Sequence, residues 1–153
     1  MEISELVQYF KEELFLPNLK AESKEDALLE IVSKFEEEGL IRKKEILLEM
    51  LKRREGLGST GIGKGLAIPH GRSTVAKDVI IAFGKSEKGI DFNSVDEKPV
   101  HLIFMVVAPP IEEGNKYLPV LGKLVEFLNN EKTRENLMKI QAYDELVKSF
   151  NEV

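Results

Sequence analysis

The spacing of apolar residues predicts two helices in the first third of the chain. Four of them recur at the period of one helical face: Leu28, Ile31, Val32 and Phe35. Ser23 precedes this set as an N-cap with the acidic Asp26 three residues later, which is the pattern of a capping box, and Gly39 is a suitable stop. A second set follows at the same period and should end near Arg54: Ile46, Leu47, Met50 and Leu51.

The middle of the chain changes to a pattern typical of strands. Residues 79–83 and 100–107 are short apolar runs with β-branched residues, and turn-forming residues flank each run. Runs that are apolar on both faces indicate central strands covered by helices on each side. The stretch between them, residues 87–99, is predicted to be a turn-rich connection.

Helical spacing returns after two consecutive prolines, Pro109 and Pro110. One face of the next helix is predicted to contain four apolar residues: Leu118, Leu121, Val125 and Leu128. Two shorter helices, near residues 133–140 and 143–150, would complete the chain. This order predicts a single α/β domain over residues 1–153, with one sheet between helices, but it does not define the strand order.

Composition narrows the classes of function. The chain has 153 residues, of which 42% are hydrophobic, so it can form one packed domain. Lys and Arg total 22 against 27 Asp and Glu, and this balance argues against a general nucleic-acid binder. The absence of cysteine excludes disulfides and sulfur-ligated zinc. With only two histidines as further ligands, we expect no metal and no other cofactor.

No segment has the composition of a targeting or membrane sequence. The N-terminal residues include several acids and no apolar core of a signal peptide. No apolar run approaches the roughly 20 residues that span a bilayer. We therefore expect a cytoplasmic protein without direct membrane insertion.

The densest motif is the glycine-rich stretch of residues 56–65. Gly58-x-x-x-x-Gly63-Lys64 matches the first part of a P-loop, but Gly65 stands where Ser or Thr must hold magnesium. A P-loop also leads from a strand into a helix, whereas residues 66–69 predict an extended segment. The Rossmann fingerprint fails for the same reason. A turn-rich connection without a function remains the alternative to a functional loop that acts together with the residues after it.

His70 follows this loop, between Pro69 and Gly71. Pro69 fixes the backbone before it and Gly71 removes bulk after it, so the imidazole should be presented rather than buried. A neutral imidazole is a competent nucleophile toward a phosphoryl group. The nearby candidate donors to an anion are Arg54, Arg72, the hydroxyls of Ser59 and Thr60, and several glycine amides. A lone histidine is also common in packing or surface roles, so residue types alone leave both interpretations open.

The residues around this histidine closely resemble the active-site signature of the fructose/mannitol class of enzyme IIA of the sugar phosphotransferase system, which includes nitrogen-regulatory relatives. The matching residues are Arg54-Glu55-x-x-Gly58-Ser59-Thr60-Gly61-Ile62-Gly63-x-Gly65-x-Ala67-Ile68-Pro69-His70-Gly71. The similarity continues through the two predicted strands and their connection, and it covers most of the chain. It implies an α/β sandwich with a mixed sheet between α-helices.

The resemblance implies a role for each matching position. His70 corresponds to the histidine that the phosphocarrier protein HPr phosphorylates, and a IIB component of a sugar permease then receives the phosphate. Arg54 corresponds to the signature arginine, with a phosphate-contacting role, and Ser59 and Thr60 correspond to its hydroxyl pair.

Two further residues are candidates for supporting roles. His101 resembles a residue of many fructose-type members, although on its own pattern it is the polar start of a buried strand. Tyr117 stands where many members have a second histidine. A phenol can hydrogen-bond to phosphate but cannot share a proton near neutral pH as imidazole does.

Three functions are compatible with these features. The first is a phosphotransferase component that passes phosphate from HPr through His70 to a IIB partner, and the second is a regulatory protein whose phosphorylation state controls its protein partners. The third, nucleotide binding by the glycine-rich loop, predicts affinity for magnesium-ATP. We favour sugar transport because the segment after His70 is more like the fructose branch. The sequence does not define the sugar, the partner or the oligomeric state.

Overall fold

One six-stranded mixed sheet runs through the computed structural model, which describes residues 1–152. Its strands are β1 (Phe10–Leu16), β2 (Gly61–Gly63), β3 (Leu66–Ala67), β4 (His70–Arg72), β5 (Ile80–Ile90) and β6 (Val100–Ala108). β6 is central, antiparallel to β5 and parallel to β3 and β4. β1 extends the sheet parallel to β5, and β2 extends it antiparallel to β3. The predicted mixed sheet is confirmed.

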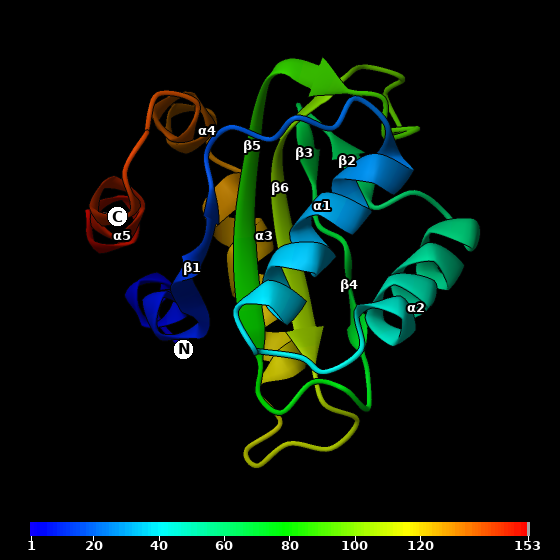
Figure 1. Cartoon of the computed structure of the whole chain (residues 1–153). Helices are drawn as coiled ribbons and strands as arrows, with labels where there is room; N and C mark the ends of the chain where they lie inside the picture. The colour runs from blue at the N-terminus through cyan, green and yellow to red at the C-terminus, as the bar shows by residue number, and fades with distance from the viewer. Residues whose placement is uncertain (153) are drawn as a thin grey trace.

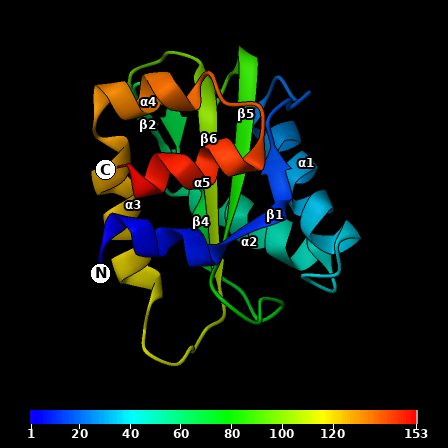
Figure 2. The same cartoon turned by 90° about the vertical axis from the view of Figure 1, so that its left-hand side faces the viewer.

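Helices cover both faces of this sheet. They are the 3₁₀ helix η1 (Ile3–Tyr9) and the α-helices α1 (Lys24–Glu37), α2 (Lys44–Gly56), α3 (Tyr117–Leu128), α4 (Glu131–Leu137) and α5 (Tyr143–Asn151). In Figure 1, α1 and α2 lie in front of the sheet and α3 lies behind it. Figure 2 shows η1, α4 and α5 grouped beside α3. None of the helices described within residues 1–152 is long and apolar enough to cross a membrane.

Alternate residues of β5 and β6 supply two separate hydrophobic cores. Phe83 and Phe104 belong to the core under α3, whereas Ala82 and Met105 belong to the core under α1 and α2. All four side chains are completely buried. Because successive side chains in a strand point to opposite faces, a sheet covered on both sides requires apolar residues at every position.

The first two helices form where their apolar period predicted them. The Ser23 hydroxyl accepts a hydrogen bond from the Asp26 backbone N–H at 3.2 Å, so the predicted N-cap is confirmed. Gly39 follows α1 with a φ of +72°, a conformation that glycine adopts without the strain of a Cβ. α2 continues two residues past Arg54, to Gly56.

The predicted apolar face of α3 is wrong in part. Leu118 and Val125 are 68% and 46% exposed. The buried residues of the helix are Tyr117, Val120, Leu124, Phe127 and Leu128. Apolar residues occur on nearly the whole circumference of α3, so two overlapping stripes fit the helical period, and the core takes the stripe with the two aromatic rings.

β5 is longer than the apolar run predicted, because it continues to Ile90 through the polar start of the predicted connection. Within this part of the strand Lys85 is completely buried. Its Nζ donates hydrogen bonds to the carbonyls of Met138, at 3.1 Å, and Ile140. Burial lowers the pKa of this lysine, with a smaller opposing effect of nearby carboxylates. A polar strand segment thus anchors the chain between α4 and α5.

Candidate functional site

His70 begins β4, the short strand that pairs with β6 beside the end of α2. Pro69 separates β4 from β3, and its carbonyl accepts a hydrogen bond from the Val106 N–H at 2.9 Å. Gly71 allows α2 to come close, because a Cβ at this position would lie 2.2 Å from Sδ of Met50. The histidine is therefore held at a half-buried position between a sheet strand and a helix end.

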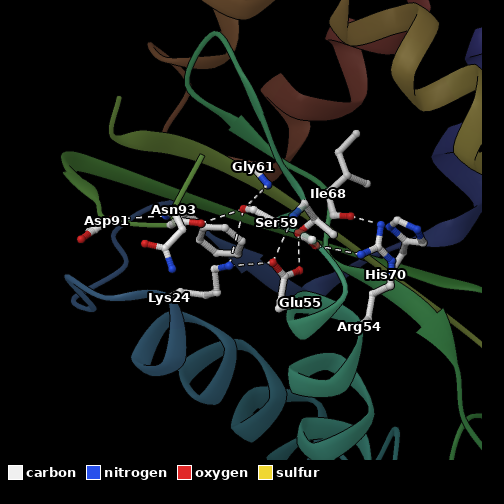
Figure 3. A network of polar contacts seen from close by, with 12 residues as sticks. Lys24, Arg54, Glu55, Ser59, Gly61, Ile68, His70, Asp91 and Asn93 are labelled. Atoms are coloured by element: carbon white, nitrogen blue, oxygen red, sulfur yellow. Dashed lines mark hydrogen bonds and ion pairs between the residues drawn. The ribbon is translucent and has the colours of Figure 1, made fainter. Parts of the chain in front are cut away.

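The imidazole of His70 has a defined tautomer. Its Nδ1 lies 2.6 Å from the carbonyl oxygen of Ile68 (Figure 3). Because a carbonyl oxygen can only accept a hydrogen bond, Nδ1 carries the proton in the neutral ring. The lone pair is then on Nε2, which is the nitrogen available as a nucleophile.

An open and mostly apolar cleft surrounds His70. Two arginines, Arg54 from α2 and Arg72 from β4, line it together with the histidine. Tyr117 and Leu118 from the start of α3 complete the opposite wall. The structure therefore brings together four of the residues that the sequence singled out: His70, Arg54, Arg72 and Tyr117.

The two arginines are oriented by contacts with the chain. Nη1 of Arg54 donates to the Gly58 carbonyl at 2.9 Å. Nη1 of Arg72 donates to the Pro109 carbonyl at 2.9 Å and to Glu112 Oε2 at 3.0 Å. A guanidinium has five N–H donors, so each arginine keeps donors for an anion in the cleft.

Tyr117 packs directly against Arg72, whose guanidinium carbon lies 4.6 Å from the centre of the phenol ring. Burial raises the pKa of Tyr117, and the charges of Arg72 and Arg54 oppose this in part. The phenol is therefore protonated throughout the neutral pH range.

Glu112 tethers the segment before α3 to the cleft. Partial burial raises the pKa of its carboxyl, but the hydrogen bond from Arg72, the Lys116 and Tyr117 amides and the Arg72 charge together lower it below its ordinary value. The carboxylate is thus charged at neutral pH and faces Arg72 at 3.0 Å.

Ser59 and Thr60 do not line the cleft, although the sequence predicts both as phosphate contacts. Ser59 Oγ donates to the Phe92 carbonyl at 2.8 Å and accepts from the Gly61 amide at 3.0 Å. Thr60 is 3% exposed, and its hydroxyl donates to the Glu55 carboxylate. Both hydroxyls are therefore engaged in holding the glycine-rich segment in place.

The amides of the glycine-rich segment are also engaged within the chain. Those of Gly63 and Lys64 donate to Ser94 Oγ at 3.2 Å and to Asp96 Oδ2 at 3.1 Å. The segment forms the antiparallel pair β2 and β3, and no helix follows it. This order differs from that of a P-loop, in which a helix follows the loop, and the expectation that several glycine amides serve an anion has no support in this geometry.

His101 does not line the cleft. It lies near the start of β6, whereas His70 pairs with Val106 near the end of that strand. Its Nδ1 lies 2.8 Å from the Ser86 carbonyl oxygen, across the β5–β6 pair. This position fits its interpretation as the polar start of a buried strand.

Three features of the site were not predicted. The apolar rim of the cleft consists of Leu57 and Leu118, and the latter was assigned to the core. Glu112 has no sequence signal, because its partner Arg72 is 40 residues away. The third feature is Glu55, which accepts two hydrogen bonds from Thr60. It was given no role, although its place within the signature was a sequence signal. Among residues 1–152, no three His, Asp or Glu side chains are grouped as metal ligands would be.

Comparisons with known proteins show the family to which the chain belongs. Residues 8–153 match the family model described as phosphoenolpyruvate-dependent sugar phosphotransferase system, EIIA 2. The chain is 34% identical over 137 residues to the fructose-specific EIIABC component of Bacillus subtilis, with 88% of this chain and 21% of that protein aligned. The chain thus spans about a fifth of that longer relative.

Nitrogen regulatory proteins are about as similar in sequence to this chain as that fructose-specific protein is. A nitrogen regulatory protein of Bradyrhizobium diazoefficiens is 36% identical over 126 residues, with 82% of this chain and 80% of that protein aligned. The crystal structure of nitrogen regulatory protein IIA-Ntr from Neisseria meningitidis superposes with a TM-score of 0.85 at 31% identity, covering 94% of this chain and 97% of that one. The chain belongs to the EIIA 2 family of the phosphoenolpyruvate-dependent sugar phosphotransferase system.

Proposed function

We propose that this protein is a phosphocarrier that accepts a phosphoryl group from phospho-HPr on Nε2 of His70 and passes it to a IIB partner for fructose-type sugar uptake. The observation that carries the proposal is the Nδ1 contact of His70 with the Ile68 carbonyl at 2.6 Å, in a cleft that two arginines line. This contact leaves the Nε2 lone pair for attack on phosphorus. The exchange with HPr would take place in the cytoplasm.

The transfer step itself moves no proton, so it needs no general acid or base on this chain. The Nε2 lone pair forms a bond to phosphorus while the bond between phosphorus and the donor breaks, and that electron pair leaves with the donor. The product ring has a proton on Nδ1 and phosphate on Nε2, so it is cationic, and the Ile68 carbonyl dipole stabilises it. A cationic ring is also a good leaving group when the phosphoryl group moves to the next acceptor.

Arg54 and Arg72 are the proposed phosphate contacts. In phosphoryl transfer the charge is spread over the peripheral oxygens, and fixed cations stabilise it most in a site that excludes water. Tyr117 can donate a hydrogen bond to the phosphate, but its raised pKa excludes proton exchange near neutral pH. Ser59 and Thr60 are not part of this proposal as direct ligands, because their hydroxyls are bonded elsewhere.

The rim of the cleft supports docking of a protein rather than a free small molecule. Leu57 and Leu118 are 87% and 68% exposed, on the ends of two helices that flank His70. Exposed large apolar residues around a polar centre are typical of protein interaction sites. A partner that covers them would also exclude water from His70.

A regulatory role is the second candidate, and the similarity to nitrogen regulatory proteins favours it. The same chemistry at His70 would then act as a switch, because a phosphate adds roughly two negative charges to the centre of the docking surface. In that case the unphosphorylated and phosphorylated forms would bind different proteins.

Phosphate incorporation from phosphoenolpyruvate, enzyme I and HPr tests both candidates. We expect acid-labile, base-stable label on the wild type and none on His70→Ala. His101→Ala is the matched control, since it removes the other histidine outside the cleft, and it should be labelled like the wild type. Absence of label on folded wild type would reject the phosphocarrier. Discharge of labelled protein by a IIB protein would favour transport over regulation.

A further inference from the structure

A nearly buried ion pair lies behind the site, outside the cleft that contains His70. Nζ of Lys24, the first residue of α1, is 3.0 Å from Oε1 of Glu55, near the end of α2. The two side chains are 14% and 6% exposed. Removing two charges from water is costly, so a pair of this kind is weak evidence for stability and calls for another role.

Both oxygens of the Glu55 carboxylate also hold Thr60. Oε1 accepts a hydrogen bond from the Thr60 backbone N–H at 3.0 Å, and Oε2 accepts one from its hydroxyl. Lys24 lies 3.5 Å from the hydroxyl of the preceding residue, Ser59. The ion pair therefore holds the two residues just before β2: Lys24 contacts Ser59, and Glu55 binds Thr60 (Figure 3).

Thr60 in turn holds the residue that orients His70. The Thr60 carbonyl accepts a hydrogen bond from the Ile68 N–H at 3.1 Å. The Ile68 carbonyl oxygen is the one that lies 2.6 Å from Nδ1 of His70. A continuous series of hydrogen bonds thus leads from Lys24 through Glu55, Thr60 and Ile68 to the imidazole.

The same ion pair affects Arg54. The Glu55–Thr60 contact closes a short loop, and Gly58, whose carbonyl accepts from Arg54 Nη1 at 2.9 Å, lies within that loop. A displacement of Glu55 would therefore move the support of the arginine as well as that of the histidine.

We propose that Lys24 and Glu55 are positioning residues for phosphoryl transfer. They hold His70 in the Nδ1–H tautomer through Thr60 and Ile68, and they hold Arg54 in the cleft through the loop that contains Gly58. The proposal rests on the proposed function of His70, but the state of the ring can be measured without phosphate. Because Glu55 fixes the backbone of Thr60 and Thr60 fixes that of Ile68, loss of the charged end should displace the Ile68 carbonyl oxygen from Nδ1.

The test compares Lys24→Met and Glu55→Gln with Lys34→Met. Lys34 is the matched control, because it lies on the same helix in a more exposed pair with Glu37 at 3.8 Å. The ring ¹⁵N shifts of His70 report the tautomer, and the rate of phosphoryl uptake from phospho-HPr reports the chemistry.

We expect the wild type and Lys34→Met to show one Nδ1–H tautomer. In Lys24→Met and Glu55→Gln the shifts should move toward a mixture of tautomers, and kcat for uptake should fall roughly tenfold or more, the lower end of what loss of an outer hydrogen-bond partner of a histidine costs at metal sites. KM for phospho-HPr should change less, since neither residue lines the cleft. Lys24→Arg keeps the charge and should restore most of the rate.

An unchanged tautomer and rate in folded Lys24→Met would overturn the proposal. If that variant does not fold, the same result in Glu55→Gln, which keeps the shape of the side chain, would overturn it. A tautomer that shifts in a protein whose wild type takes up no phosphate would reject the proposed function and keep the positioning role.

Discussion

Nδ1 of His70 and the carbonyl oxygen of Ile68 lie 2.6 Å apart, within one short turn of the chain. This contact is made by a backbone group two residues before the histidine, and Pro69 between them restricts the backbone that makes it. The direct partner of the ring thus comes from its own turn, and Arg72 follows on the same strand, whereas Arg54 comes from α2. The nucleophile is defined before any partner arrives.

The position of the phosphate on the ring follows from this contact. Because Nδ1 is protonated and hydrogen-bonded, we expect phosphate on Nε2 only. Phosphorus and ¹⁵N NMR of the phosphorylated protein distinguishes the two isomers by the ring nitrogen that couples to phosphorus. Phosphate found on Nδ1 would show that the Ile68 contact breaks before transfer.

The two glycines Gly61 and Gly122 should respond oppositely to alanine. A Cβ at Gly61 would lie 2.9 Å from the backbone Cα of Ser94, so Gly61→Ala should lower the free energy of unfolding by about 1–3 kcal/mol. A Cβ at Gly122, within α3, would meet no atom within 4 Å, and Gly122→Ala should raise it by about 1 kcal/mol. Urea unfolding measures both, and equal stability of Gly61→Ala and wild type would contradict the close packing of the hairpin on Ser94.

The tyrosines should ionise later in the folded protein than in the unfolded chain. Burial is the largest cause that raises the pKa of all three above 10.0: Tyr9, Tyr117 and Tyr143. The folded state therefore keeps protons that the unfolded state loses, so the stability from these groups is complete below pH 10 and is lost as pH rises through the folded pKa values. Ultraviolet titration of folded and urea-unfolded protein measures this, and Tyr117→Phe should remove one tyrosine from the late transition. A folded protein that titrates at pH 10.0 would contradict it.

Local signals in the sequence predicted the elements that local chemistry determines. Ser23 and Gly39 marked the ends of α1, and the double-sided apolar runs marked β5 and β6. The resemblance grouped His70 with Arg54, and the structure places both residues in one cleft. The caps and apolar runs depend on neighbours in sequence, whereas the grouping of Arg54 with His70 rests on the resemblance.

Long-range contacts explain what the sequence did not predict. The second half of β5 was not predicted because it contains Lys85. A buried lysine in a strand requires hydrogen-bond acceptors, and here they are distant carbonyls such as that of Ile140. Ser59 and Thr60 were assigned to phosphate because hydroxyls next to a nucleophile suit that role, whereas Glu55 and the Phe92 carbonyl engage them. Which partner a polar side chain takes depends on the tertiary fold, and a pattern along the chain does not record it.

Leu118 provides the sharpest test of how a partner docks. This side chain is 68% exposed on the rim of the His70 cleft, so Leu118→Asp should leave the melting temperature unchanged while it places a charge inside the proposed interface. We expect KM for phospho-HPr to rise about tenfold or more with a smaller change in kcat, since central apolar contacts contribute most of the binding free energy and the chemistry at His70 is untouched. Val95→Asp is the matched control, because Val95 is 71% exposed and lies outside the cleft. Equal KM values for the two variants would mean that the partner reaches His70 without covering this rim, and that the apolar residues around the cleft serve another contact.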